Sequence, residues 1–173
     1  MTTKDIINRV ANSGLIDLDL SDYFPKERIV EVDLKQFLFQ EKILKEREFR
    51  KSVQNHDFSF CSQLHVAIYC SSKAIVPMWS YMLIASRILP IAKSIAFGTS
   101  IEVLQNLCLK NIDNINADIF RNKRVIVKGC GDGELSESMY VSICTKLQPV
   151  VKSLMYGEAC SSVPVYKKST QKT

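Results

Sequence analysis

The chain has 173 residues, of which 46% are hydrophobic and 24% are charged. This length favours one domain, which buries about 70% of the surface that the unfolded chain exposes. The composition is typical of a globular protein and excludes a disordered or fibrous one. The net charge is +5 at pH 7, and the basic residues are not interleaved with aromatic ones. We therefore expect a solvated basic surface and tail, and not a nucleic-acid interface.

We do not expect the chain to enter or cross a membrane. Its opening residues include Lys4, Asp5 and Arg9, and these charges exclude a secretory signal peptide. The most apolar stretch, residues 74–86, is too short to span a bilayer. We therefore expect a cytoplasmic protein, in which the six cysteines are thiols or metal ligands and not disulfides.

Residues 1–64 are predicted to form an N-terminal α+β extension that covers one side of the core. The pattern indicates a short helix at residues 3–13 and strands at residues 15–20 and 28–34, where apolar and polar residues alternate. Residues 42–55 are strongly charged apart from a narrow apolar stripe, which is typical of a helix on the surface.

The rest of the chain contains an internal repeat, because residues 66–98 align without gaps on residues 125–157. The aligned copies share these identical pairs: Val66/Val125, Tyr81/Tyr140, Ile84/Ile143, Pro90/Pro149, Lys93/Lys152, Ser94/Ser153 and Gly98/Gly157. Each copy is predicted to form a strand, a helix and a second strand, at residues 65–70, 77–89 and 94–97 and at residues 124–128, 136–147 and 153–156.

This alternation predicts an α/β fold with a mainly parallel sheet built from two pseudo-symmetric strand–helix–strand repeats. The simplest strand order is 2-1-3-4, which places the first strands of both repeats side by side and opens a ligand crevice at their carboxyl ends. The single domain, residues 1–173, is expected to consist of the following segments: the N-terminal cover (1–64), repeat one (65–98), a linker helix and loop (99–124), repeat two (125–157) and a C-terminal tail (158–173).

The helix of the first repeat differs from that of the second, since residues 78–85 are apolar nearly all round. Such a helix has to be covered on both sides. We expect the N-terminal extension to cover it, and a second subunit, in a homodimer, is the alternative.

Three cysteines each follow a predicted parallel strand, namely Cys70, Cys130 and Cys160. Neighbouring strands lie about 4.8 Å apart, so thiols at adjacent strand ends can meet at one centre. Zinc or an iron–sulfur cluster suits such a sulfur-rich set, and Asp132 and Glu158 are candidate accessory ligands. The alternatives are structural thiols, or a nucleophilic Cys130 activated by surrounding backbone N–H groups.

The other cysteines are expected to be structural. Cys108 and Cys144 lie on the inward stripes of predicted helices, as small buried hydrophobic residues do. Cys61 lies in a polar loop and has no evident partner.

A glycine-rich loop follows the first strand of the second repeat. Its residues Lys128, Gly129, Gly131, Asp132 and Gly133, with the N-terminus of the next helix, are candidates to hold a phosphate or carboxylate. The loop is similar to the first glycine-rich motif of methyltransferases that use S-adenosylmethionine. Against this interpretation, Lys128 stands where those enzymes have an acidic residue, and too few residues follow to complete their fold.

Several segments together resemble one family. These segments are Ile43-Leu44-Lys45-Glu46, Asn55-His56-Asp57, Ala74-Ile75-Val76-Pro77, Val127-Lys128-Gly129-Cys130 and Met155-Tyr156-Gly157-Glu158-Ala159-Cys160-Ser161-Ser162-Val163-Pro164. Over nearly its whole length the chain resembles the bacterial family called domain of unknown function 2480. The resemblance implies no activity. It does imply an association with iron–sulfur assembly proteins as partners, which favours a sulfur or iron role for the three cysteines.

Three functions are therefore left open by the sequence. The first is a cysteine-lined site at the carboxyl edge of the sheet that binds a metal or assists iron–sulfur or sulfur handling. The second is a non-catalytic protein-interaction module with structural cysteines. The third is a small-molecule enzyme that binds an anionic ligand at residues 129–133.

Overall fold

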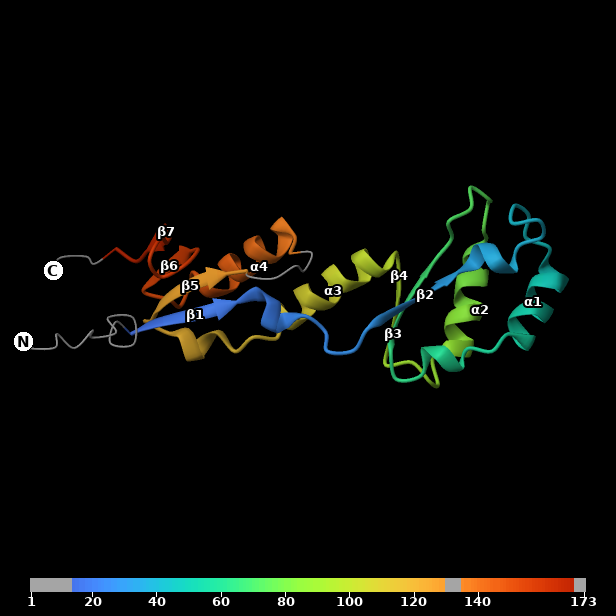
Figure 1. Ribbon diagram of the computed structural model, residues 1–173, viewed down its shortest axis with the longest axis horizontal. Coiled ribbons are helices and arrows are strands. Elements are labelled where there is room, and N and C mark those ends of the chain that lie inside the picture. The colour runs from blue at the N-terminus through green and yellow to red at the C-terminus, as the bar shows by residue number, and fades with distance from the viewer. Residues whose placement is uncertain (1–13, 130–134, 170–173) are drawn as a thin grey trace, which may run out of the picture. The chain divides into compact units, whose positions relative to one another are not determined.

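The computed structural model describes residues 14–129 and 135–169. It divides into two compact units (Figure 1). Unit 1 consists of residues 1–24 and 107–173, and unit 2 consists of residues 25–106. No helix in the described part of the chain has the length and apolar character needed to cross a membrane.

Unit 2 is built on an all-parallel sheet, sheet B, with the strand order β2-β3-β4. Its strands are β2 (Ile29–Asp33), β3 (His65–Tyr69) and β4 (Ser94–Phe97). The central strand β3 is buried from His65 to Ile68, as expected for a parallel strand that is covered on both faces. Helix α2 (Met78–Ile88) makes the crossover from β3 to β4.

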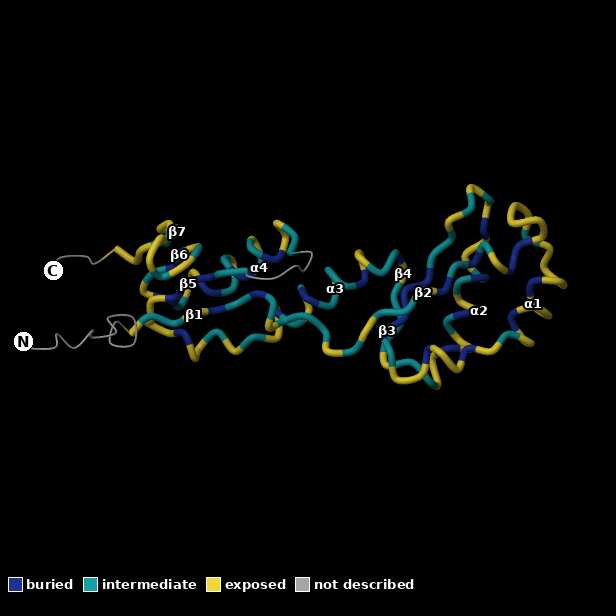
Figure 2. The backbone as a smooth tube through the Cα atoms, viewed as in Figure 1, coloured by how far each residue is buried: buried dark blue, intermediate teal, exposed yellow. Residues whose placement is uncertain are grey.

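The core of unit 2 is completed by helix α1 (Glu46–Asn55) and the short helices η2 (Leu34–Phe37) and η3 (Ser59–Cys61). The buried face of α1 is marked in Figure 2 and includes Phe49 and Val53. The ring of Phe49 meets that of Trp79 edge to face, with 5.7 Å between centroids. The N-terminal segment therefore covers one side of α2, as the sequence predicted.

Unit 1 is built on sheet A, with the strand order β1-β5-β6-β7. Strands β1 (Leu15–Asp19), β5 (Arg124–Lys128) and β6 (Ser153–Tyr156) are parallel, and β7 (Val163–Lys167) is antiparallel to β6. Helix α4 (Glu137–Leu147) connects β5 to β6, and short helices η1 (Leu20–Tyr23) and η4 (Ala117–Phe120) complete the unit. The chain passes between the units twice, once between Phe24 and Pro25 and once within helix α3 (Ser100–Asp113).

The internal repeat is present in the structure, down to the register of the strands. Val66 pairs with Ile95 in sheet B, and Val125 pairs with Leu154 at the equivalent place in sheet A. Residues with positive φ angles also recur at equivalent positions of the two repeats. Gln63 and Asn122 have φ angles of 56° and 57°, and Gly98 and Gly157 have φ angles of 128° and 107°. The last two positions favour glycine because side chains rarely tolerate that conformation.

The repeat extends to the N-terminal strands, which the sequence alignment did not include. In each unit a strand leads directly into a short helix, β1 into η1 and β2 into η2. Asp19 and Asp33 cap these helices, because their carboxylates accept hydrogen bonds from the backbone N–H groups of Ser21 and Lys35, each at 2.9 Å.

The α/β fold with mainly parallel strands and two strand–helix–strand repeats is confirmed. The predicted strand order 2-1-3-4 is wrong, since the repeats lie in two separate sheets. The physical reason is that β1 and β2 join the sheets as parallel neighbours of β5 and β3, so the first strands of the repeats do not pair with each other. The helix predicted at residues 3–13 lies outside the described residues, and the single domain stays a prediction.

Candidate functional site

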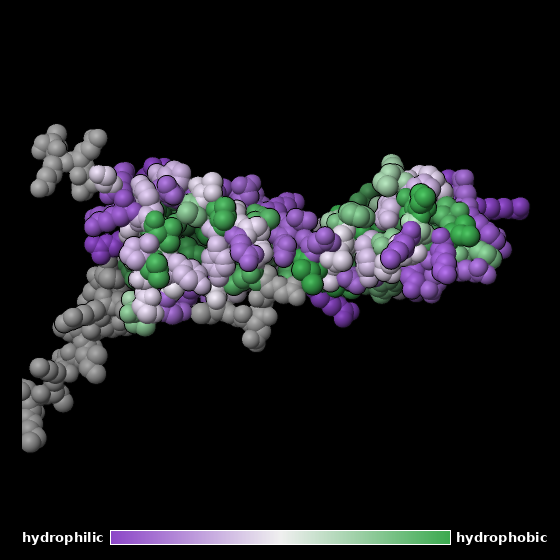
Figure 3. All heavy atoms as spheres, turned by 90° about the horizontal axis from the view of Figure 1, so that it is seen from above, coloured by the Kyte–Doolittle hydropathy of each residue, from purple (hydrophilic) through white to green (hydrophobic). Residues whose placement is uncertain are grey.

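An apolar groove lies between the crossover helix and the last parallel strand in each unit. The α2–β4 groove of unit 2 has a volume of about 510 Å³ and the α4–β6 groove of unit 1 about 450 Å³. Figure 3 shows hydrophobic side chains gathered around a hollow on unit 1. The grooves are lined at equivalent positions by Tyr81/Tyr140, Met82/Val141, Ala85/Cys144, Ser86/Thr145, Ala96/Met155 and Phe97/Tyr156.

A pair of aromatic rings belongs to each groove. Tyr81 and Phe97 meet edge to face with their centroids 5.6 Å apart, and Tyr140 and Tyr156 do so at the same distance. Burial raises the pKa of Tyr81, with further contributions from Cys70 and Asp33. Tyr81 and Tyr140, which are identical in the two repeats, therefore form a wall of the groove in each unit.

The grooves differ in what lies beside their strand. In unit 1, β7 pairs with β6, and Val165 of β7 lines the groove. In unit 2, β4 pairs only with β3 among the described residues. Large apolar side chains there are open to solvent, with Met82 and Leu89 each 70% exposed and Phe97 73% exposed. Unit 2 thus combines an apolar groove with an unpaired strand edge.

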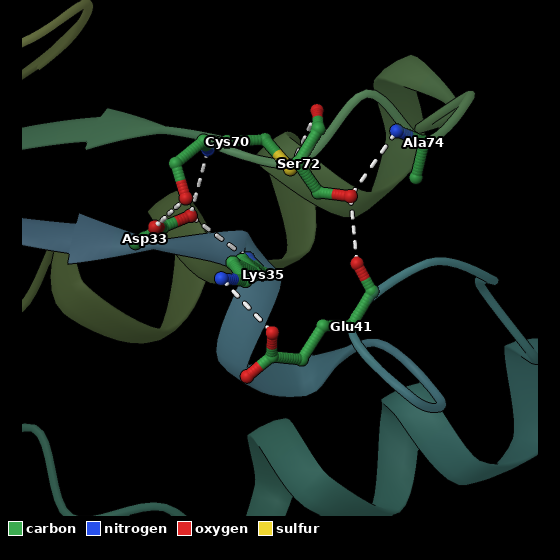
Figure 4. A network of polar contacts seen from close by, with 7 residues as sticks. Asp33, Lys35, Glu41, Cys70, Ser72 and Ala74 are labelled. Atoms are coloured by element: carbon green, nitrogen blue, oxygen red, sulfur yellow. Dashed lines mark hydrogen bonds and ion pairs between the residues drawn. The ribbon is translucent and has the colours of Figure 1, made fainter.

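A polar cluster lies at the carboxyl edge of sheet B (Figure 4). The Asp33 carboxylate accepts hydrogen bonds from the Ser71 backbone N–H at 3.0 Å, the Ser71 hydroxyl at 2.5 Å and the Lys35 N–H. Burial raises the pKa of Asp33, but these hydrogen bonds and the nearby Lys35 charge outweigh burial and leave the pKa below its ordinary value. Asp33 therefore ties the end of β2 to the loop after β3.

The same cluster contains Cys70, the first of the predicted metal ligands. Its thiol donates to the carbonyl oxygen of Ser72 at 3.8 Å, and the Ser72 hydroxyl donates to the carbonyl oxygen of Glu41 at 2.6 Å. An ion pair of 2.9 Å to Glu41 raises the pKa of Lys35, and the negative charge of Asp33 adds to this effect. Because these groups are partners of one another, they hold the loop after β3 against the segment after η2.

The three predicted cysteine ligands do not end adjacent strands of one sheet. Cys70 follows β3 of sheet B, whereas the exposed Cys160 follows β6 of sheet A. Cys130 and Asp132 lie outside the described residues. Among the residues that are described, no three His, Cys, Asp or Glu side chains form a group suited to a metal ion. Metal binding by Cys70, Cys130 and Cys160, with Asp132 and Glu158, stays a prediction.

The other cysteines are packed into the protein to different degrees. Cys108 is buried, and burial raises its pKa to about 11. Cys61 is also buried and has a pKa raised by burial, although the sequence placed it in a polar loop. Cys144 lines the α4–β6 groove, where its equivalent in unit 2 is Ala85. Cys61 and Cys108 act as small hydrophobic residues. Cys144 is only partly buried, and its thiol donates a hydrogen bond to Gln148 Oε1 at 3.8 Å.

The described part of the glycine-rich loop has a packing role. A side chain at Gly129 would collide with the side chains of Leu135 and Tyr140, so glycine there lets the backbone after β5 approach these two residues closely. The Nζ atom of Lys128 is 3.5 Å from the Asp17 carboxylate, so these two side chains form an ion pair within sheet A. Gly131, Asp132 and Gly133 lie outside the described residues, and anion binding by this loop stays a prediction.

A serine–histidine pair lies at the amino edge of sheet B. The Nδ1 atom of His65 is 2.6 Å from the Ser94 hydroxyl, and its Nε2 atom is 3.6 Å from a Glu27 oxygen. Glu27 is bound more closely by Lys93, at 2.7 Å, and this hydrogen bond is the main reason that its pKa is lowered. His65 is buried, and Arg124 takes its place in the repeat, so we interpret the pair as fixing the starts of β3 and β4.

The protein family described as "Protein of unknown function (DUF2480)" matches residues 4–168 of the chain. No curated protein matches significantly. No solved structure does either.

Proposed function

Because the chain belongs to the DUF2480 family, whose description names no function, we propose one from its geometry. The protein is a non-catalytic interaction module that takes up an extended polypeptide segment at the α2–β4 groove. The observation that carries this proposal is the conjunction of an apolar groove with a strand edge that is unpaired among the described residues.

The two features of the site supply the two parts of strand recognition. An unpaired edge offers backbone N–H and C=O groups in a row, which bind any extended chain. The groove beside it offers apolar contacts to alternate side chains of that chain. Exposed Met82, Leu89 and Phe97 form an apolar patch of the kind that marks interaction sites.

Unit 1 supports the proposal, because it contains a strand bound in the same way. There β7 (Val163–Lys167) pairs with β6, with a register shift that leaves Val165 without a Cα partner on β6, and the Val165 side chain lines the α4–β6 groove. The α4–β6 groove is equivalent to the α2–β4 groove at the positions that form its walls. The expected ligand of unit 2 is therefore an extended segment with apolar residues at alternate positions.

We also propose a cytoplasmic location in a bacterial cell. The described cysteines, which are Cys61, Cys70, Cys108, Cys144 and Cys160, are free, as suits a reducing compartment. The iron–sulfur assembly proteins implied by the family resemblance are proposed as further partners of the protein.

Site-specific photo-crosslinking in cells tests the proposed function. A crosslinking residue at Met82 or Leu89 is expected to capture a discrete polypeptide, and mass spectrometry is expected to map the bond to one extended segment. Ile75 is the matched control, since it is in unit 2 and 94% exposed but does not line the groove. If Met82 and Leu89 capture no more than Ile75 does, the proposed function is wrong.

A further inference from the structure

The described sheets have four edges, and three of them carry features that prevent pairing. Strand β1 carries Asp17, β2 carries Glu31, and β7 carries Pro164, Lys167 and an irregular register. Charges, proline and irregular pairing are the means by which proteins protect a sheet edge. Strand β4, with the sequence Ser-Ile-Ala-Phe, has none of them. Its edge is therefore suited to being paired in the working protein.

We propose that the strand bound at β4 is the β4 of a second copy of the chain. This inference rests on the strand-binding function proposed above and names its partner. Two copies related by a twofold axis pair their β4 strands in antiparallel fashion and join two sheets B into one continuous sheet.

Symmetry favours this partner. A twofold axis perpendicular to a sheet makes equivalent edge strands antiparallel, and this is the direction in which β7 already binds β6 in unit 1. Strand β4 has 4 residues, the same length as β6, which pairs with β7 in unit 1. The edge therefore has the direction and extent required for pairing with itself.

The side chains around the edge are also compatible with a symmetric contact. An isologous interface places each patch against itself, so charged residues at its centre would repel their own copies. The strand β4 has no charged residue, and the exposed Met82, Leu89 and Phe97 that line the groove beside it are apolar. The exposed Lys93, just before the strand, is paired with Glu27 of its own chain. Pairing two copies removes these side chains from water, which supplies the driving force.

Pairing with a second copy also explains why α2 is apolar nearly all round. The sequence indicated that this helix needs cover on both sides, and α1 covers one side through Phe49 and Trp79. The other side of α2 lines the groove, where the Met82 side chain is 70% exposed. A second copy at β4 brings the missing cover to this side.

Sedimentation equilibrium on the full chain tests the inference, with hydrogen exchange to locate the contact. We expect a dimer that dissociates on dilution, and β4 amides whose protection falls with it. Phe97→Asp is expected to raise the dimer dissociation constant by a factor of about 30 or more, as loss of a central contact does. Tyr156→Asp, at the equivalent position of unit 1, is expected to leave it unchanged, and circular dichroism confirms that both variants are folded.

The outcomes separate this inference from the proposed function. A chain that is monomeric at every concentration overturns the dimer, and crosslinks from Leu89 to a different polypeptide would then leave the strand-binding function standing. A dimer that survives Phe97→Asp, or that is lost with Tyr156→Asp, overturns the β4 interface. Assemblies that grow beyond two copies overturn the closed twofold arrangement.

Discussion

Units 1 and 2 have the same strand–helix–strand frame, and they differ in how the last parallel strand is used. In unit 1 the chain itself supplies β7 as the neighbour of β6, whereas in unit 2 the edge of β4 is unpaired among the described residues. The equivalent groove residues Tyr156 and Phe97 are 49% and 73% exposed. The repeat thus contains two versions of one groove, and the version occupied by β7 is the basis of the ligand that we propose for the other.

The largest effect is expected from making unit 1 resemble unit 2. Truncation after Ser162 removes β7 and leaves β6 as an unpaired edge beside an apolar groove. Each molecule would then have two open edges, so we expect sedimentation velocity to show assemblies larger than a dimer. Adding Phe97→Asp to the truncated chain should limit assembly to pairs. If the truncated chain sediments like the full chain, the equivalence of the two edges is contradicted.

The second prediction concerns α1, whose counterpart in unit 1 is the part of α3 after residue 106, because each precedes a short helix and the first strand of its repeat. The buried Phe49 of α1 corresponds there to the smaller, buried Cys108. Phe49→Ala removes a fully buried ring from the core of unit 2 and is expected to lower the free energy of unfolding by about 3–5 kcal/mol. Hydrogen exchange should show the loss of protection in unit 2 amides. Lys51→Ala, on the exposed face of α1, is the control. Equal loss of protection in both units would show that they unfold as one domain.

The third prediction compares the caps of η1 and η2. Asp33→Ala is expected to lower the free energy of unfolding by about 0.5–2 kcal/mol through loss of the cap, and Asp19→Ala removes the equivalent cap in unit 1. Because the folded protein lowers the pKa of Asp33, its ionised form contributes stability above the unfolded pKa of about 3.9. That contribution should disappear as the pH falls through the lower folded pKa.

Urea unfolding of the parent chain and of Asp33→Ala at a series of pH values measures this contribution. The difference in stability between the two should be constant near neutral pH and should shrink in acid. A difference that grows as the pH falls would contradict the direction of the Asp33 pKa.

The smallest effect is expected from the cysteines outside the cores. The proposed interaction function predicts that Cys70→Ser and Cys160→Ser remain folded and keep their oligomeric state. Elemental analysis of the anaerobically purified chain should find less than one metal ion per chain. Stoichiometric zinc or iron that is lost with Cys160→Ser would instead support the cysteine site predicted from the sequence.

Local patterns in the sequence predicted most helices and strands. The helix predicted at residues 77–89 is α2 (Met78–Ile88), and the strand predicted at residues 94–97 is β4 (Ser94–Phe97). Their apolar periodicity is a property of neighbouring residues, so the sequence reveals it directly. Strand β7 was missed because Pro164 argues against a strand, although an edge strand tolerates proline.

Only part of the candidate site could be predicted from the sequence. The identities Tyr81/Tyr140 and Gly98/Gly157 indicated the repeat. They did not indicate that Tyr81 is a groove wall, or that β4 lacks a second neighbour in the described part of the chain. The cysteines were grouped at one edge because each follows a strand, and this grouping assumed one sheet. Which strands become neighbours depends on contacts between distant segments, and apolar strands of similar length offer no local signal for that choice.

The sequence by itself therefore determined most of the described helices and strands, the duplication and the glycine at the positive-φ position that ends each repeat. Only the tertiary structure decided that the two copies lie in separate sheets, one with its edge occupied by β7 and one without. Periodicity records which face of an element is buried, whereas strand pairing is made by backbone groups that are the same in every residue except proline.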